Sequence, residues 1–106
     1  MKPYLVFSTV GSPKEGKKIA SVLVREKLAA CVNVIPGVFS VFKWRGKMDH
    51  ARELLLIVKT DVRHLKKIEQ TIRKHHSYQV PEIIGWPLAW GHQPYLDWLR
   101  DSVRLS

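Results

Sequence analysis

Val38-Phe39-Ser40-Val41-Phe42-Lys43-Trp44 is a run with large apolar side chains in both of its alternating sets. Trp44 and every second residue before it fall on one side of a strand, whereas Phe39 and Val41 fall on the other, because side chains alternate along a strand. A strand that is apolar on both faces must be covered on both, and a small domain usually covers only one. The run therefore predicts a β-strand that contacts a partner subunit.

The segment before this run predicts a strand, a helix and the start of the same long strand. Tyr4–Thr9 is apolar and β-branched, which is typical of a buried strand. Ser12-Pro13-Lys14-Glu15 has the pattern of a capping box and predicts the start of an amphipathic helix. The second strand begins at Cys31, and Pro36-Gly37 interrupts it, which predicts a bulge.

The segment after the run predicts two further strands and two further helices. Arg45-Gly46 indicates a turn, and Glu53–Thr60 is typical of a third strand. Asp61 is a suitable cap for a second helix, with apolar positions at helical spacing up to the closing pair His75 and His76. A fourth strand is expected over Pro81–Ala89, and Pro87 confines it to an edge or a bulge. A short C-terminal helix is marked by Tyr95, Leu96, Leu99 and Val103. We expect the fourth strand to pack against this helix through Trp86, Trp90 and Trp98.

The order of these elements is β-α-β-β-α-β followed by one extra helix. This is the ferredoxin-like, or split βαβ, pattern of the α+β class, with an antiparallel sheet. Right-handed crossovers place both long helices on one face of the sheet, so the other face is left open in a single chain. The length of 106 residues fits one domain over residues 1–106.

Composition narrows the classes of function. A net charge of +9 attracts anions, but nucleic-acid binding needs more than charge and the signature of an RNA-recognition fold is absent, so nucleic acid is not the expected partner. A single cysteine allows no internal disulfide and suits a reducing compartment, and the apolar runs are too short to span a bilayer. We expect a cytoplasmic protein that is not an enzyme, because there is neither a phosphate-binding glycine loop nor a Ser-His-Asp spacing above chance.

Several spaced motifs resemble the CutA family. They cover the chain from about Phe7 to Leu99 and agree in order with the family pattern: Leu28-Ala29-Ala30-Cys31-Val32-Asn33, Ile35-Pro36-Gly37, Trp44-Arg45-Gly46-Lys47, Glu53-Leu54-Leu55-Leu56, His76-Ser77-Tyr78, Val80-Pro81-Glu82-Ile83-Ile84 and Tyr95-Leu96-Asp97-Trp98. The resemblance implies a homotrimer of ferredoxin-like subunits, tolerance of divalent metals and, in some members, copper binding. It attaches no catalytic reaction to the chain.

The histidine pair is the first candidate site. His75 and His76 match a pair that copper-binding relatives use, and imidazole suits copper and other divalent cations. Adjacent helical residues point about 100° apart, so the two can share an ion only if the helix frays or another subunit adds ligands. The alternative is that both only cap the helix. Ser8 stands where some relatives have a cysteine, which favours Cu(II) over Cu(I). The N-terminal amine, His50, His64 and His92 are the other candidate donors.

A second group of residues is a candidate ligand pocket or subunit interface. Trp44, Glu53, Lys59 and Tyr78 match marked family positions and mix aromatic, acidic and basic groups, as small polar pockets do. Phe39 joins Trp44 as an interface candidate, and Cys31 is expected to be a small buried hydrophobe and not a nucleophile. The structural alternative is that all of them serve only packing and assembly.

Two functions remain open from the sequence. The first is a trimeric protein of divalent-metal tolerance that binds copper or another divalent cation. The alternative is a trimeric signalling or scaffold protein that binds an anionic small molecule or a partner protein in clefts between subunits. This alternative rests on analogy with the trimeric nitrogen-regulatory PII proteins.

Overall fold

The four strands form one antiparallel sheet in the order β2-β3-β1-β4. The computed structural model describes residues 2–104 of the chain. This strand order is that of the ferredoxin-like fold, so the predicted class and the antiparallel sheet are confirmed. The strands are β1 (Pro3–Val10), β2 (Cys31–Trp44), β3 (Lys47–Asp61) and β4 (Ile84–Pro87).

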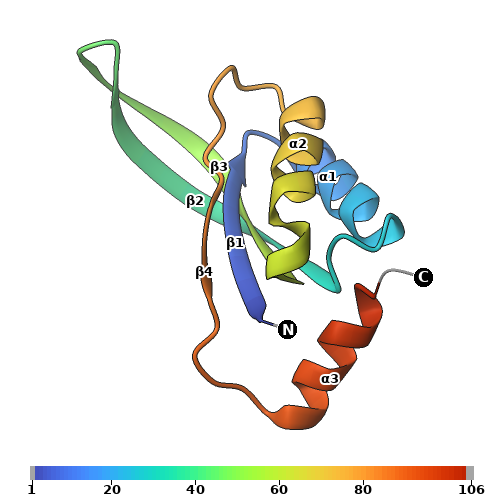
Figure 1. Cartoon of the computed structure of the whole chain (residues 1–106). Helices are drawn as coiled ribbons and strands as arrows, with labels where there is room; N and C mark the ends of the chain where they lie inside the picture. Colours follow the sequence, from blue (N-terminus) through green and yellow to red (C-terminus); the bar gives the residue numbers. More distant parts are fainter. Residues whose placement is uncertain (1, 105–106) are drawn as a thin grey trace.

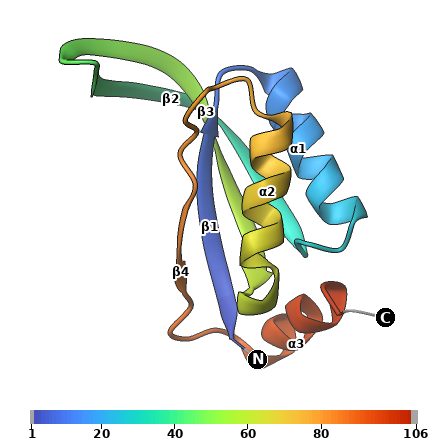
Figure 2. The ribbon, with the colours of Figure 1, turned by 45° about the horizontal axis from the view of Figure 1, so that its top comes forward.

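Two helices cover one face of this sheet, as the sequence predicts. They are α1 (Pro13–Arg25) and α2 (Leu65–His75), and both lie on the same side of the sheet (Figures 1 and 2). Ser12 caps α1 by accepting a 3.2 Å hydrogen bond from the Glu15 N–H. The helices turn their apolar sides to the sheet, and the core consists of buried residues from α1, α2 and the facing sides of the strands, including Val6, Val10, Ile19, Leu23, Leu54, Leu56, Val58, Ile68 and Ile72.

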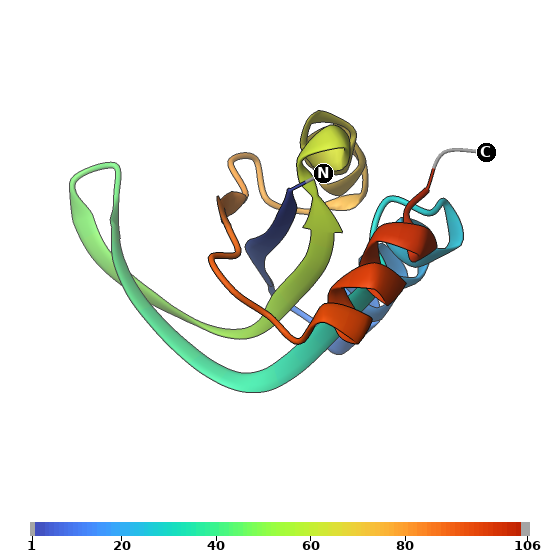
Figure 3. The same cartoon turned by 60° about the horizontal axis from the view of Figure 1, so that its bottom comes forward.

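The hairpin of β2 and β3 projects well beyond the helices. It forms the long curved arm of Figures 1 and 3, and the molecule measures 44 × 25 × 22 Å as a result. Arg45 (φ 53°) and Gly46 (φ 80°) make the two-residue turn at its tip, with both residues in the left-handed region as a type I′ turn requires. The predicted bulge is present, because the pairing with β3 shifts between Ile35 and Val38.

Two strands differ in length from the prediction. β3 begins at Lys47 and not at Glu53, because the polar segment before Glu53 pairs across the turn with β2. β4 is only four residues long and pairs with β1 alone, at the sheet edge that Pro87 predicted. Gly85 allows its close approach, since a Cβ there would lie 2.7 Å from the Leu5 carbonyl oxygen.

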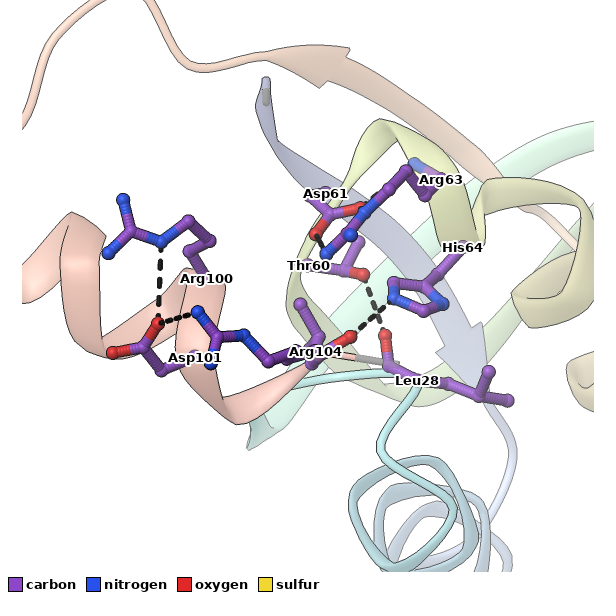
Figure 4. A network of polar contacts seen from close by, with 9 residues as sticks. Leu28, Thr60, Asp61, Arg63, His64, Arg100, Asp101 and Arg104 are labelled. Carbon is purple, nitrogen blue, oxygen red and sulfur yellow. Dashed lines mark hydrogen bonds and ion pairs between the residues drawn. The ribbon is translucent and has the colours of Figure 1, made fainter. Parts of the chain in front are cut away.

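The second helix begins with a separate turn. Asp61 caps a 3₁₀ segment, Val62–His64 (η1), by accepting a 2.8 Å hydrogen bond from the Arg63 N–H. The buried His64 ring, the next residue along, has its Nε2 2.7 Å from the Val103 carbonyl oxygen (Figure 4). This bond joins the end of the C-terminal helix α3 (Gln93–Ser102) to the turn that follows β3. Leu99 of α3 and Val103 directly after it are fully buried.

The tryptophans after β3 are placed differently from the prediction. Trp86 packs on Phe7 of the neighbouring strand, with ring centroids 4.8 Å apart, and Trp98 packs on Tyr95 of its own helix. Trp90 is 86% exposed. Pairing β4 with β1 places Trp86 on the sheet, so the expected packing of β4 against α3 through these rings is wrong.

The face of the sheet away from α1 and α2 carries exposed apolar side chains. Ile35, Ile84 and Trp86 are each between 41% and 55% exposed on it, and the hairpin adds Phe39, Val41, Phe42, Trp44 and Met48. In residues 2–104 we find no helix that is long and apolar enough to cross a membrane.

Candidate functional site

A groove of about 770 Å³ lies between the hairpin and the loop that follows α2. Side-chain alternation places Trp44 of β2 and Asp49 and Glu53 of β3 on the same face of the hairpin. The loop contributes the opposite wall, and the lining residues are Thr9, Ser40, Val41, Phe42, Trp44, Asp49, His50, Ala51, Glu53, Tyr78, Gln79, Val80 and Glu82. We call this space the hairpin groove. It brings together three of the predicted pocket residues, namely Trp44, Glu53 and Tyr78.

Tyr78 and Glu53 join the loop to the hairpin. The Tyr78 hydroxyl donates a 2.8 Å hydrogen bond to Glu53 Oε2, and Glu53 is only 8% exposed. Burial raises the pKa of Tyr78 to about 12, and the hydrogen bond and negative charge of Glu53, with a smaller contribution from Glu15, act in the same direction. Tyr78 is therefore a neutral donor at physiological pH, and it fixes the orientation of the carboxylate in the groove wall.

His76 holds the first residues of this loop in place. It leaves the helix with an extended backbone (φ −90°, ψ 140°), and its side chain is fully buried. Its Nε2 lies 2.7 Å from the Thr9 carbonyl oxygen, which can only accept, so Nε2 carries the hydrogen and donates. The other ring nitrogen, Nδ1, then accepts a 3.0 Å hydrogen bond from the Tyr78 N–H. Both nitrogens are thus engaged in holding β1, α2 and the loop together.

Glu15 lies beside this histidine. Its Oε2 is 3.4 Å from His76 Nδ1, is buried, and has no hydrogen-bond partner. A buried carboxylate oxygen without a partner is costly, so the site holds a negative charge that the described protein atoms neutralise only in part. The sequence pattern assigned Glu15 to helix capping alone and gave no signal of this contact.

The other predicted residues lie apart from Tyr78 and Glu53. His75 is the last residue of α2 and is half-buried. Phe39 is 61% exposed and lines a second groove, of about 530 Å³, on the other side of Glu53. Cys31 and Lys59 pair with each other on the open face of the sheet, where Lys59 Nζ lies 5.8 Å from the centroid of the Tyr95 ring. These two residues do not line the hairpin groove.

Asp49, His50 and Glu82 also line the hairpin groove. The sequence named His50 only as an alternative donor and Glu82 only within a family motif, and it did not single out Asp49. Asp49 and His50 come from the charged start of β3, and Glu82 comes from the loop after Tyr78. All three are exposed. Asp49 and Glu82 are far apart in the chain, and only the fold of the loop after α2 brings Glu82 to the groove beside the hairpin, so local spacing could not reveal the pair.

The arrangement of donors decides what kind of ion the groove suits. Asp49, Glu53 and Glu82 provide carboxylates, which suit divalent cations without thiolate ligands. The His50 ring lies on the other face of the hairpin, where its centroid is 5.4 Å from that of Phe39. Within residues 2–104, however, no three side chains of His, Cys, Asp or Glu lie close enough together to hold one ion. The groove thus fits a cation held by ligands from more than one copy or by water, and not one enclosed by a single chain.

Ser8 stands at the position that corresponds to a cysteine in some copper-binding proteins. Ser8 lies on the helix-covered face of β1, is fully buried, and its hydroxyl has no hydrogen-bond partner. It does not line either groove. The histidine pair stays a prediction, with His76 engaged on both nitrogens and no hydrogen bond found for the His75 ring in the described part of the chain.

Residues 4–102 match the family model described as "CutA1 divalent ion tolerance protein". A divalent-cation tolerance protein CutA of Thermus thermophilus is 44% identical over 99 residues, which cover 93% of this chain and 96% of that protein. The chloroplastic protein CutA of Arabidopsis thaliana is 44% identical over 100 residues, or 94% of this chain and 55% of that protein. The crystal structure of CutA1 from Oryza sativa superposes with a TM-score of 0.96 at 40% identity, covering all of this chain and 97% of that one.

The lengths of these relatives differ. The chain spans about half of the Arabidopsis protein, at 55%, but nearly all of the Thermus protein, at 96%. The names of the curated relatives describe tolerance of divalent cations or the family alone, and they name no reaction.

Proposed function

The chain belongs to the CutA1 family of divalent ion tolerance proteins, and from this we propose that it binds divalent cations in the hairpin groove as a homotrimer. The ions that the groove suits include Cu(II). A donor set of carboxylates without thiolate favours Cu(II) over Cu(I), because Cu(I) prefers sulfur ligands. Cys31, the chain's one thiol, does not line the groove.

The presence of three carboxylates in the lining of one groove carries this proposal. Asp49, Glu53 and Glu82 are a third of the nine acidic residues of a chain whose net charge is +9. Like charges gathered at the rim of a cleft raise the local concentration of counter-ions of opposite sign. The groove therefore favours a cation over an anion.

Assembly into a trimer supplies what a single chain lacks. The open sheet face and the hairpin expose apolar side chains that a soluble chain usually covers, with Phe39 at 61% and Met48 at 72% exposed. The number three comes from the family resemblance. In such a trimer, the hairpin of one subunit packs against the sheet of the next and brings further donor side chains to its groove. These donors supply the ligands that one chain lacks.

The alternative function is a scaffold that binds an anionic small molecule between subunits. The acidic lining of the hairpin groove disfavours an anion there. The second groove has one cation, Arg52, beside the carboxylate of Glu53. We therefore place the cation-binding function first.

Calorimetric titration with Cu(II) and Zn(II) tests the proposal. Asp49→Asn with Glu82→Gln removes two of the groove carboxylates, and both residues are exposed, so the fold tolerates the change. The matched control is Asp97→Asn with Asp101→Asn on α3, which removes the same charge away from the groove. Weaker binding in the groove variant alone supports the proposal, whereas equal affinity in all three proteins contradicts it.

A further inference from the structure

The outer surface of the helical layer is strongly basic. In α1 the exposed cations are Lys14, Lys17, Lys18 and Arg25. In α2 they are Lys66, Lys67, Arg73 and Lys74. Within residues 2–104 none of these eight forms an ion pair, and the two helices lie side by side over one face of the sheet (Figure 2). We call this surface the basic helix face.

Helix stability does not account for the positions of these cations. Cations favour the last turn of a helix, which explains Arg25, Arg73 and Lys74. Lys14 and the pair Lys66 and Lys67 lie instead in first turns, where the helix dipole opposes a positive charge. The first turn of α2 contains no acidic residue to offset them. Glu15 in the first turn of α1 and Asp61 at the cap of the turn before α2 offset these lysines only in part, and a bound anion completes the compensation.

The shape of the face selects among anionic partners. Its two helices turn their apolar sides to the sheet, so neither can insert into a bilayer as an amphipathic membrane helix does. It has no exposed aromatic side chain, so single-stranded bases find nothing to stack on. The α1 helix alone, at about 1.5 Å per residue, extends its cations over roughly 16 Å between Lys14 and Arg25. Cations on the outer sides of two neighbouring helices offer several contacts to the phosphate backbone of a duplex.

We propose that the basic helix face binds the phosphate backbone of double-stranded nucleic acid without reading its sequence. This function is separate from cation binding in the hairpin groove, since the helices cover the opposite face of the sheet. It also revises the expectation from composition that nucleic acid is not a partner. That expectation rested on net charge alone, whereas the fold places eight of the 18 Lys and Arg residues on one surface.

Fluorescence anisotropy with labelled DNA duplexes of two unrelated sequences tests this inference. We expect equal affinity for both sequences and steep weakening between about 50 and 200 mM salt. Lys14→Gln with Lys67→Gln removes one cation from each helix. This variant is expected to weaken binding at ~100 mM salt by more than tenfold and to lower the slope of log affinity against log salt by about 1.8, or 0.9 for each lost phosphate contact.

Two controls separate this surface from net charge and from folding. Lys43→Gln with Lys47→Gln removes the same charge from the hairpin and is expected to leave the affinity and the salt slope nearly unchanged. The melting temperature of the helix-face variant is expected to stay the same or rise, because the lost lysines opposed the helix dipoles. Equal loss in both variants, no duplex binding at low salt, or binding to phosphatidylserine vesicles without binding to duplex would each overturn the inference.

Discussion

The Tyr78 hydroxyl lies 2.8 Å from Glu53 Oε2, although the two residues are 25 positions apart in the chain. The bond joins the loop after α2 to the middle of β3, at the point where the hairpin leaves the body of the sheet. His76 supports the same loop from behind through its bonds to the Thr9 carbonyl and the Tyr78 N–H. One wall of the hairpin groove is thus held by a tyrosine and a histidine that are separated by a single residue.

Replacing Tyr78 by phenylalanine is expected to destabilise the protein. The change leaves the nearly buried Glu53 carboxylate without its hydroxyl partner, which costs about 1–3 kcal/mol for a buried polar group. Urea denaturation followed by circular dichroism measures the loss. Tyr95→Phe is the matched control, because its hydroxyl makes no hydrogen bond within the described residues. The same stability in both variants would show that the bond contributes nothing.

The same tyrosine predicts a loss of stability at high pH. The pKa of Tyr78 is raised to about 12 in the folded protein, against 10.0 for an ordinary tyrosine. The unfolded chain therefore releases this proton first, and the stabilising effect is present below pH ~10 and declines as pH rises towards ~12. Ultraviolet titration should show one late-titrating tyrosine that is absent from Tyr78→Phe. If all three tyrosines titrate together near 10, the raised pKa is wrong.

Removing the aromatic ring of Trp44 is expected to weaken assembly. The ring is 45% exposed on the hairpin, and truncating an aromatic at the centre of an interface costs roughly 2–4 kcal/mol. If the chain assembles into the proposed trimer, Trp44→Ala should shift it towards monomer in sedimentation velocity at micromolar protein. Trp90→Ala serves as the control, since Trp90 is more exposed but lies outside the hairpin. A trimer that is unchanged by Trp44→Ala, or equally weakened by both, counts against an interface at the hairpin.

The histidine pair is expected to divide its roles. His76→Ala removes the donor to the Thr9 carbonyl and the acceptor for the Tyr78 N–H, so it should lower the free energy of unfolding by about 1–3 kcal/mol. His75→Ala should have little effect on stability. Copper titration of both single variants then tests the predicted metal site: weaker binding in His75→Ala, whose fold is intact, supports it. Full copper binding by the His75→Ala and His76→Ala double variant would exclude the pair as ligands.

The sequence was sufficient for the fold because local signals agreed with one another. The capping pattern at Ser12, the Arg45-Gly46 turn and the break at Pro36-Gly37 all appear where predicted, since each rests on backbone geometry that few residues satisfy. The start of β3 was missed because Lys47–Arg52 lacks an apolar alternation and is held as a strand only by its pairing with β2.

The site was predictable only in part. Glu53 and Tyr78 were named from family positions, but their bond depends on how the loop after α2 folds back on the hairpin. The contact of Glu15 with His76, and the placement of Asp49 and Glu82 along one groove, bring together segments that are distant in the chain. Such contacts depend on tertiary packing, and the spacing of residues along one sequence does not predict them.

Native mass spectrometry of the chain, purified without chelators and then incubated with Cu(II), tests the central claim most directly, because it reports subunit number and bound metal in one spectrum. We expect a species of three chains that carries copper, and a trimer of Asp49→Asn with Glu82→Gln that carries less. A monomer, or a trimer whose copper content is the same with and without the groove carboxylates, would contradict the account.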